Sequence, residues 1–276
     1  MSLPSVFLIA AAFGQVAADT TAGPATSPDD PAARKAQLKQ FVEVAESYRI
    51  TLHSAKPELL ELSPTPILNW TGSAFVWQKD GHPEAIGSFW TDFYPRSERV
   101  RWHHAFHSLS DQPLTAEFDS KMIWMPRRPG IAFQPVAGAE PPADKPRQRL
   151  AQMRTLSREF SVVQTRDSGK TRLRLLTQPV LRYEPTAGVA KDGAIFAFAH
   201  PTSGTDPDAL LLIEARESEG GVRWEFALAR FHFVETAAFL GEKEVWKVES
   251  ESLEMRRTVF GGGQGRDKIY YSVAPP

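Results

Sequence analysis

The sequence predicts an α+β fold made of two similar units, 33–142 and 146–276. Each unit is expected to hold one helix followed by an antiparallel sheet of about five or six strands. Three observations support this class: an ordered series of matched segments in the two halves, helix-type spacing at the start of each half, and alternating apolar and polar residues after it. The pattern predicts a tandem duplication.

The matched segments keep one order along both halves of the chain. Val100-Arg101-Trp102 returns as Val222-Arg223-Trp224, 122 residues later, and Trp124 meets Trp246 at the same spacing. Five further pairs precede these: "RKAQLKQF" and "RLAQMRTL", Leu60-Glu61-Leu62 and Leu173-Arg174-Leu175, "PILNW" and "PVLRY", "GSAFVW" and "GAIFAF", "PEAI" and "PDAL". One pair could arise by chance, but an ordered series indicates duplication.

Each unit begins with a predicted helix. In the first, Asp30-Pro31 supplies a cap and a first-turn proline, and Leu38, Phe41, Val42 and Ala45 follow the spacing of one apolar face. In the second, Asp144 and Pro146 precede a less strict apolar face, formed by Leu150, Met153, Leu156 and Phe160. Each helix is expected to pack its apolar stripe on a sheet.

Period-two segments and turn residues predict the strands. "YRITLHS" and "ELLEL" alternate, and "FSVVQT" and "TRLRLL" flank the turn sequence "RDSGK". Two further hairpins join "SAFVWQK" to "EAIGSFW" and "AIFAFAH" to "ALLLIEA". The glycine run at 261–265 lacks the Lys-Ser/Thr of a phosphate loop, so it is expected to be a hairpin tip.

Composition and charge exclude several classes of function. The chain has 276 residues, of which 42% are hydrophobic and 24% charged, as in folded soluble proteins. With 32 basic and 33 acidic side chains, it has no basic excess for a phosphate backbone, so we expect no nucleic-acid partner. The absence of cysteine excludes disulfides, thiolate metal sites and a cysteine nucleophile.

The N-terminus is expected to be a signal peptide over residues 1–18, followed by a disordered linker over 19–32. Val6–Phe13 is an apolar run of signal length, and small residues precede a cleavage point before Asp19, although no Lys or Arg occurs before Arg34. The run is too short for a membrane span, so none is expected in the mature chain. The predicted location is periplasmic or secreted; the alternative is a buried N-terminal helix.

The stretch "RWHHAFHSLS", residues 101–110, contains the candidate site residues His103, His104 and His107. Its partner segment "RWEFALARFH" alternates like a strand. On a strand, His103 and His107 share a face but lie about 13 Å apart, too far for one metal ion, and His104 points the other way. A metal would need further ligands such as His82, His53 or Asp92, and we expect neither a metal nor a cofactor.

Positions that differ between the two units are the better candidates for a specialised site. His82, His103, His104 and His107 correspond to Asp206, Glu225, Phe226 and Ala229, so these histidines belong to the first unit alone. The alternative is that these positions differ between the units through sequence drift, without a function. Matched positions such as Gly72 and Gly193, Phe75 and Phe196, Trp102 and Trp224 are expected to serve packing and turns, although tryptophans could instead line a ligand groove.

The sequence contains no Gly-x-Ser-x-Gly elbow, His-Glu-x-x-His motif or dinucleotide fingerprint. The stretches "NWTGSAFVWQKDGHPEAIGSFW", "WHHAFHSLS" and "LLTQPVLRYE" resemble a family of uncharacterised exported bacterial proteins, over most of 34–248. The resemblance implies export and supplies no chemistry.

The leading hypothesis is therefore an exported, non-catalytic binding or interaction protein whose ligand is a small molecule or a protein. One alternative is an enzyme, such as a hydrolase, with His103, His104, His107 or His82 at its site, because histidine transfers protons near neutral pH. The other alternative is a structural scaffold without a ligand pocket.

Overall fold

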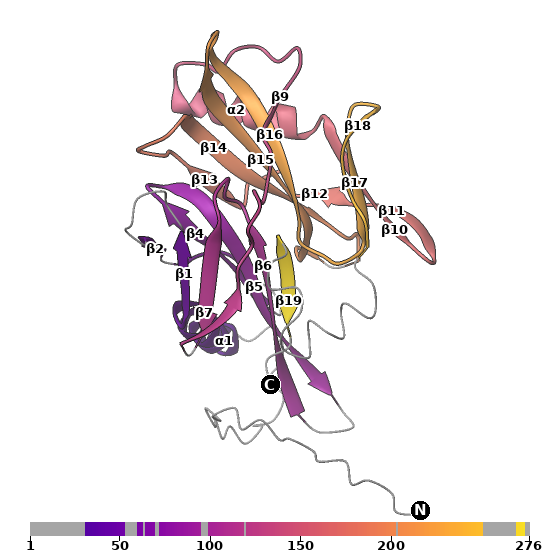
Figure 1. Cartoon of the computed structure of the whole chain (residues 1–276). Helices are drawn as coiled ribbons and strands as arrows, with labels where there is room; N and C mark the ends of the chain where they lie inside the picture. Colours follow the sequence, from indigo (N-terminus) through magenta and orange to yellow (C-terminus); the bar gives the residue numbers. More distant parts are fainter. Residues whose placement is uncertain are drawn as a thin grey trace, which may run out of the picture.

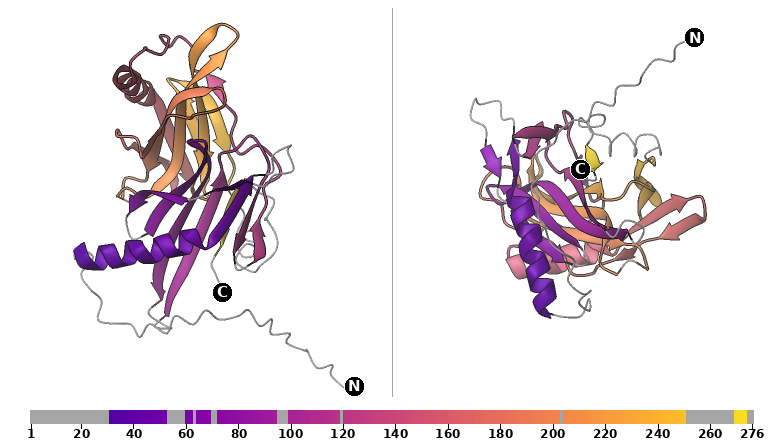
Figure 2. Two further views of the ribbon diagram at one scale, coloured as in Figure 1. Left: turned by 90° about the vertical axis from the view of Figure 1, so that its left-hand side faces the viewer. Right: turned by 90° about the horizontal axis from the view of Figure 1, so that it is seen from below.

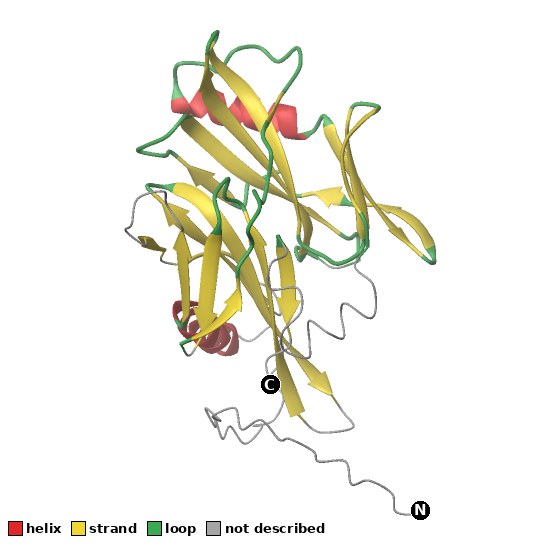
Figure 3. Ribbon diagram, in the orientation of Figure 1, coloured by secondary structure: helices red, strands yellow, loops and turns green. Residues whose placement is uncertain are grey.

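The computed structural model describes residues 31–52, 60–62, 64–69, 72–94, 99–118, 120–202, 204–250 and 269–273. Antiparallel strands make up most of it, with two helices, so the α+β class is confirmed (Figure 3). The predicted signal peptide, the predicted linker up to residue 30 and the glycine run at 261–265 lie outside the described residues. The last two residues of the predicted linker belong to the first helix.

Helix α1 (Pro31–Glu46) and helix α2 (Pro146–Ser157) begin the two halves. In α1, Phe41 and Ala45 are fully buried, as their spacing predicts. In α2, Met153 and Leu156 are buried, but the helix ends before Phe160, which starts a strand. The weaker periodicity near Phe160 therefore marks a helix end. Figure 2 shows the two helices at opposite ends of the molecule.

The first half contains two sheets (Figure 1). The first small sheet has the order β2-β1-β7-β8, and the first large sheet has the order β19-β6-β5-β4-β3. The strands are β1 (Tyr48–Leu52), β2 (Leu60–Leu62), β3 (Pro64–Asn69), β4 (Gly72–Lys79), β5 (His82–Tyr94), β6 (Arg99–Ser108), β7 (Leu114–Phe118), β8 (Lys121–Trp124) and β19 (Tyr270–Val273).

The second half also contains two sheets. The second small sheet has the order β11-β10-β17-β18, and the second large sheet has the order β12-β14-β15-β16-β9, with β13 also paired to β14. The strands are β9 (Gln134–Pro135), β10 (Phe160–Arg166), β11 (Gly169–Arg172), β12 (Arg174–Leu175), β13 (Leu181–Tyr183), β14 (Ala190–Ala199), β15 (Pro207–Ser218), β16 (Gly221–Arg230), β17 (Glu235–Leu240) and β18 (Lys243–Val248).

The expectation of a single sheet of five or six strands in each half is therefore wrong. The alternating pattern identifies a strand and its buried face, but it carries no information about which strand becomes the partner. In the first half β7 returns to pair with the first strand, β1, and in the second half β17 returns to pair with β10. That long-range pairing divides the strands between a small and a large sheet.

The two halves also pair equivalent residues. In the first large sheet, Ile86 of β5 lies opposite His107 of β6. In the second, Leu210 of β15 lies opposite Ala229 of β16. These four residues occupy positions matched in the sequence comparison above, so the β5–β6 pair and the β15–β16 pair have the same register.

The large sheets each end on a strand from elsewhere in the chain. Strand β9, near the end of the first half in sequence, pairs with β16 of the second half through Gln134 and Pro135. Strand β19, near the end of the chain, pairs with β6 of the first half. The halves are therefore connected by backbone hydrogen bonds in both directions.

Among the residues that the structure describes, three apolar cores separate the layers. One lies between the first small sheet, α1 and the first large sheet, and it contains Phe41 and Phe75. Its counterpart in the second half contains Met153 and Phe196. The third core, here called the middle core, lies between the two large sheets, with Val76 on one side and Leu212 on the other. The halves thus meet through the faces of their large sheets.

Candidate functional site

The histidines of β6 do not form one site. The side chain of His103 lies outside the described residues. His104 is buried in the core of the first half, where it forms a hydrogen bond with the hydroxyl of Tyr48 and lies edge-on to Phe89. A histidine satisfied in this way has a packing role.

His107 lies on the opposite face of the sheet from His104 and is also buried, with 3% of its surface exposed. Its Nδ1–H donates a 2.7 Å hydrogen bond to the carbonyl of Ser108. Burial, assisted by the charge of Arg230, lowers the pKa of His107 to about 3, despite the bond to Ser108. His107 is therefore neutral at physiological pH.

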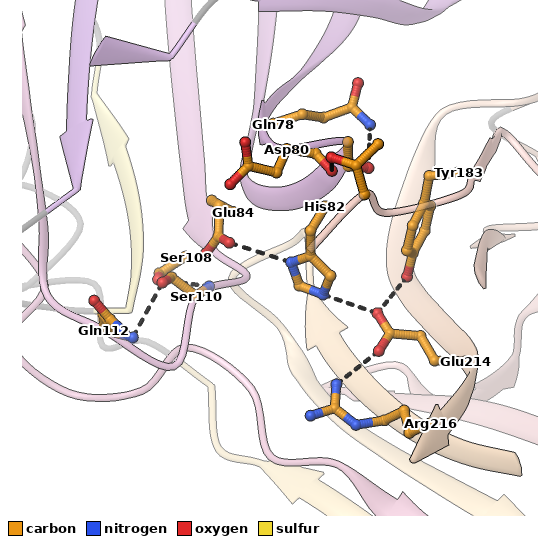
Figure 4. A network of polar contacts seen from close by, with 12 residues as sticks. Gln78, Asp80, His82, Glu84, Ser108, Ser110, Gln112, Tyr183, Glu214 and Arg216 are labelled. Atoms are coloured by element: carbon orange, nitrogen blue, oxygen red, sulfur yellow. Dashed lines mark hydrogen bonds and ion pairs between the residues drawn. The ribbon is translucent and has the colours of Figure 1, made fainter. Parts of the chain in front are cut away.

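His82 is the predicted candidate that the structure surrounds with ionisable groups. Its Nδ1 lies 3.2 Å from Oε1 of Glu84, and its Nε2 lies 3.0 Å from Oε1 of Glu214 (Figure 4). Carboxylates only accept hydrogen bonds, so both ring nitrogens donate and His82 is an imidazolium. Burial acts to lower the pKa of His82, but the hydrogen bonds and charges of Glu214 and Glu84 outweigh it and raise the pKa to about 9.

Glu214 connects His82 to the second half of the chain. The hydroxyl of Tyr183 donates to its Oε1 at 2.7 Å, and Nη1 of Arg216 donates to its Oε2 at 2.7 Å. Burial opposes ionisation of Glu214, but its bond to His82 and its other partners lower its pKa below the ordinary value. Burial and the adjacent carboxylate raise the pKa of Tyr183 well above its ordinary value, so the phenol remains protonated.

The ion pairs continue along the second large sheet. Nε of Arg216 lies 3.1 Å from Glu225, and Arg223 binds the other oxygen of Glu225 at 2.6 Å. The guanidinium of Arg216 also lies over the ring of Phe133, 4.1 Å from its centroid. We call the six groups the interface ion network: Glu84, His82, Glu214, Arg216, Glu225 and Arg223. Their signs alternate, and their charges sum to zero.

A tight turn places His82 against the second half. Asp80 and Gly81 both have positive φ, 50° and 81°, as a two-residue hairpin turn between β4 and β5 requires. The backbone N–H of Thr186, between β13 and β14, donates to the carbonyl of Asp80 at 2.9 Å. This contact fixes the turn on the second half.

Gly193 makes room for the Tyr183–Glu214 bond. A Cβ at Gly193 would lie 2.5 Å from the Tyr183 ring, closer than any side chain tolerates. The matched Gly72 is crowded in the same way by the backbone of Phe89. Both glycines are therefore packing positions.

A cavity of about 190 Å³ lies beside this network, between the two halves. It is smaller than the range of about 300–1,000 Å³ typical of sites for drug-sized ligands. Its walls come from the β4–β5 hairpin, the segment after β6, the segment before β9, the β13–β14 loop and β15. The lining residues are Lys79, Asp80, His82, Glu84, Leu109, Asp111, Ile131, Phe133, Ala187, Gly188, Val189, Ala190 and Arg216.

His82 is a candidate from the sequence alone, whereas Glu214, Tyr183 and Arg216 are found only in the structure. A signal for Glu214 is present, because its carboxylate interrupts the apolar run of "ALLLIEA". A charged residue inside a buried strand needs a partner. Its partner His82 is 132 residues away in sequence, so the pair could not be assigned without the fold. Within the described ranges, no three His, Asp or Glu side chains are placed to hold a metal ion.

Comparison with protein-family models gives no match, and comparison with curated proteins gives none either. Among solved structures, the chain shows a weak similarity to the crystal structure of MucB, with 10% identity and a TM-score of 0.15. The match covers 81% of this chain and 62% of the MucB chain. A TM-score this low does not indicate a shared fold. In the described part of the chain, neither helix has the length and apolar character needed to cross a membrane.

Proposed function

We propose that the protein is an exported, non-catalytic binding protein that holds a small polar molecule in the cavity between its halves. One observation carries the proposal: the cavity of about 190 Å³ is bounded on one side by Glu84 and His82 and on the other by Arg216. Concave sites with a few fixed polar groups are where proteins bind small molecules. A scaffold without a ligand has no need of such a site.

The charge states of the histidines favour binding over catalysis. Both ring nitrogens of His82 donate to carboxylates, so neither is available to accept a proton from a substrate. His107 is neutral but buried, with Nδ1 bonded to the backbone. Groups with fixed charge and fixed partners suit recognition, because they are already oriented before the ligand arrives.

Export is the proposed location. The apolar run at 6–13 and the small residues before Asp19 support it, as does the resemblance to exported bacterial proteins. Mass spectrometry of the protein from its host is expected to give an N-terminus near Asp19. A protein that keeps residues 1–18 intact in the cytoplasm would contradict export.

We also propose that the two halves arose by tandem duplication. The ordered sequence matches support this, and so do the equal strand orders and registers of the small and large sheets. On this view the shared positions are structural, while His82, Glu214 and Arg216 differ between halves because the site is specialised. An experimental structure in which 33–130 and 146–250 fail to superpose would contradict the duplication.

Closing the cavity tests the proposed function. Ala187 lines the cavity and is exposed, so Ala187→Trp is expected to fill the site without disturbing a core. The matched control is Ala151→Trp, on the exposed face of α2. In thermal unfolding with a panel of small polar metabolites, at least one compound should raise the Tm of wild type and Ala151→Trp but not of Ala187→Trp. No stabilising compound, or equal stabilisation of Ala187→Trp, would refute binding in this cavity.

A further inference from the structure

We infer that the ligand is a small zwitterion, a molecule that carries one carboxylate and one ammonium group on a short aliphatic body. The inference rests on the proposed function, since it names the chemical class of molecule that the interface cavity accepts. It follows from the two polar atoms that the interface ion network leaves unused, from the charge balance of that network and from the size of the cavity.

Arg216 has a donor that its protein partners do not use. Its Nη1 binds Glu214 and its Nε binds Glu225, and Phe133 covers one face of the guanidinium. Among the described residues, its Nη2 has no hydrogen-bond partner. Since Arg216 lines the cavity, its Nη2–H can donate a hydrogen bond to a carboxylate oxygen of a ligand.

Glu84 has a matching unused acceptor. Its Oε1 lies against His82, while its Oε2 has no hydrogen-bond partner within the part of the chain that the structure describes. The side chain is 11% exposed and lines the same cavity. A carboxylate oxygen that is largely removed from water favours a charged donor, which an ammonium group supplies.

The two atoms belong to opposite walls. Glu84 is on β5 of the first large sheet, and Arg216 is on β15 of the second. A ligand that uses both must carry its carboxylate at one end and its ammonium at the other. Such a ligand would bridge the two halves of the protein.

The charge balance of the site favours a ligand that carries no net charge. The six groups of the interface ion network sum to zero. The charged side chains that line the cavity also sum to zero, with Lys79, His82 and Arg216 opposite in sign to Asp80, Glu84 and Asp111. A lone anion or cation would therefore leave an uncompensated charge in a partly buried site. A zwitterion adds no net charge. It also gains charge-assisted hydrogen bonds that a neutral amide would form more weakly.

The size and the remaining walls restrict the ligand further. An engineered cavity of about 150 Å³ in another protein accepts benzene, so one of about 190 Å³ accommodates about six to eight non-hydrogen atoms. Leu109, Ile131 and Phe133 provide apolar contact for a short carbon body. Small amino acids and their ω-amino analogues have this size and this charge pattern.

Isothermal titration of the full-length mature protein tests the inference with single compounds. The panel comprises L-alanine, β-alanine and γ-aminobutyrate as zwitterions, propionate as carboxylate alone, ethylammonium as cation alone, and propionamide as neutral analogue. At least one zwitterion should bind about tenfold or more tightly than each of the other three compounds, as loss of one charge-assisted bond implies. Equal binding of propionate or propionamide would overturn the inference.

Two variants locate the ammonium contact. Glu84→Gln keeps the shape of the side chain but removes its negative charge, so the zwitterion should bind about tenfold more weakly while propionate, which needs no ammonium contact, should bind no more weakly than before. Glu159→Gln, the same change at an exposed position just after α2 and outside the cavity lining, is the matched control and should leave both affinities unchanged. Unchanged zwitterion affinity in Glu84→Gln would overturn the assignment.

The outcomes separate this inference from the proposed function. If no zwitterion binds, the ligand class is wrong. The Ala187→Trp comparison with the wider metabolite panel then still decides whether the cavity binds any small molecule. If Glu84→Gln does not fold, the comparison of zwitterions with propionate and propionamide on the wild-type protein decides the inference alone.

Discussion

His82 and His107 lie in the same large sheet but carry opposite charge states. His82 faces two carboxylates, which hold it as an imidazolium, whereas His107 faces a backbone carbonyl and the charge of Arg230, and it stays neutral. The difference comes from the neighbours that the fold supplies, because both residues are histidines on adjacent strands. At the scale of single residues, long-range packing therefore decides protonation.

The raised pKa of His82 predicts a stability that falls at alkaline pH. An unfolded histidine has a pKa near 6.5, while folded His82 has one of about 9. The stabilisation is therefore fully present below pH 6.5 and is lost as pH rises from there through about 9. His82→Gln should remove up to about 3 kcal/mol of unfolding free energy at pH 6, and much less at pH 10, in urea titrations.

His200→Gln is the control for this pH dependence. His200 is half-buried just after β14 and lies outside the interface ion network, so its replacement should leave the loss of stability between pH 6 and pH 10 as in wild type. If His82→Gln showed the same loss of stability at every pH, the ion pairs of His82 would not be the cause.

At the scale of elements, ion pairs with a buried carboxylate hold α2 against the second large sheet. Asp192 of β14 is fully buried. Its carboxylate accepts a hydrogen bond from Nε of Arg149 in α2 at 2.6 Å and another from Nη2 of Arg182 in β13 at 2.9 Å. One carboxylate thus fixes a helix and two strands. Apolar burial of Met153 and Leu156 places the helix, and the ion pairs fix its position along the sheet.

Asp192→Asn is expected to weaken this attachment. The amide cannot neutralise two guanidinium groups, so the change should cost about 2–3 kcal/mol of unfolding free energy in urea titrations. Asp144→Asn, the same change at an exposed position just before α2, should stay within about 0.5 kcal/mol of wild type. A similar small effect of Asp192→Asn would show that apolar packing alone positions α2.

At the scale of the whole molecule, the halves are expected to unfold together. The middle core is shared by both large sheets, β9 and β19 cross between the halves, and His82 bonds to Glu214 across the same interface. Separation of the halves would expose the apolar faces of two sheets to water at once, which is unfavourable.

Leu212→Ala tests this cooperativity, because Leu212 is fully buried in the middle core. The substitution should cost about 2–5 kcal/mol and lower the unfolding midpoint of both halves equally. Hydrogen exchange of amides in β4 and in β14 can follow the halves separately. Val222→Ala, at a side chain that is 40% exposed, is the control. Loss of protection in β14 alone would contradict a single cooperative unit.

The sequence by itself determined the local elements and the matching of the halves. The face of α1 with Phe41 and Ala45 and the hairpin β4–β5 follow from periodicity and turn residues, which are properties of neighbouring residues. The matched segments predict that Gly72 and Gly193 serve packing and turns. The helix end near Phe160 was missed because its pattern is weak.

Only the tertiary structure decided how the strands divide among four sheets and which residues meet at the site. Strands β9 and β19 pair with the other half, and His82 meets Glu214 across 132 residues of sequence. Such pairings depend on which apolar faces pack together, and many partners satisfy the same alternating pattern. The sequence therefore specified His82 as a candidate, while the packing of the two large sheets supplied its partners and the cavity beside it.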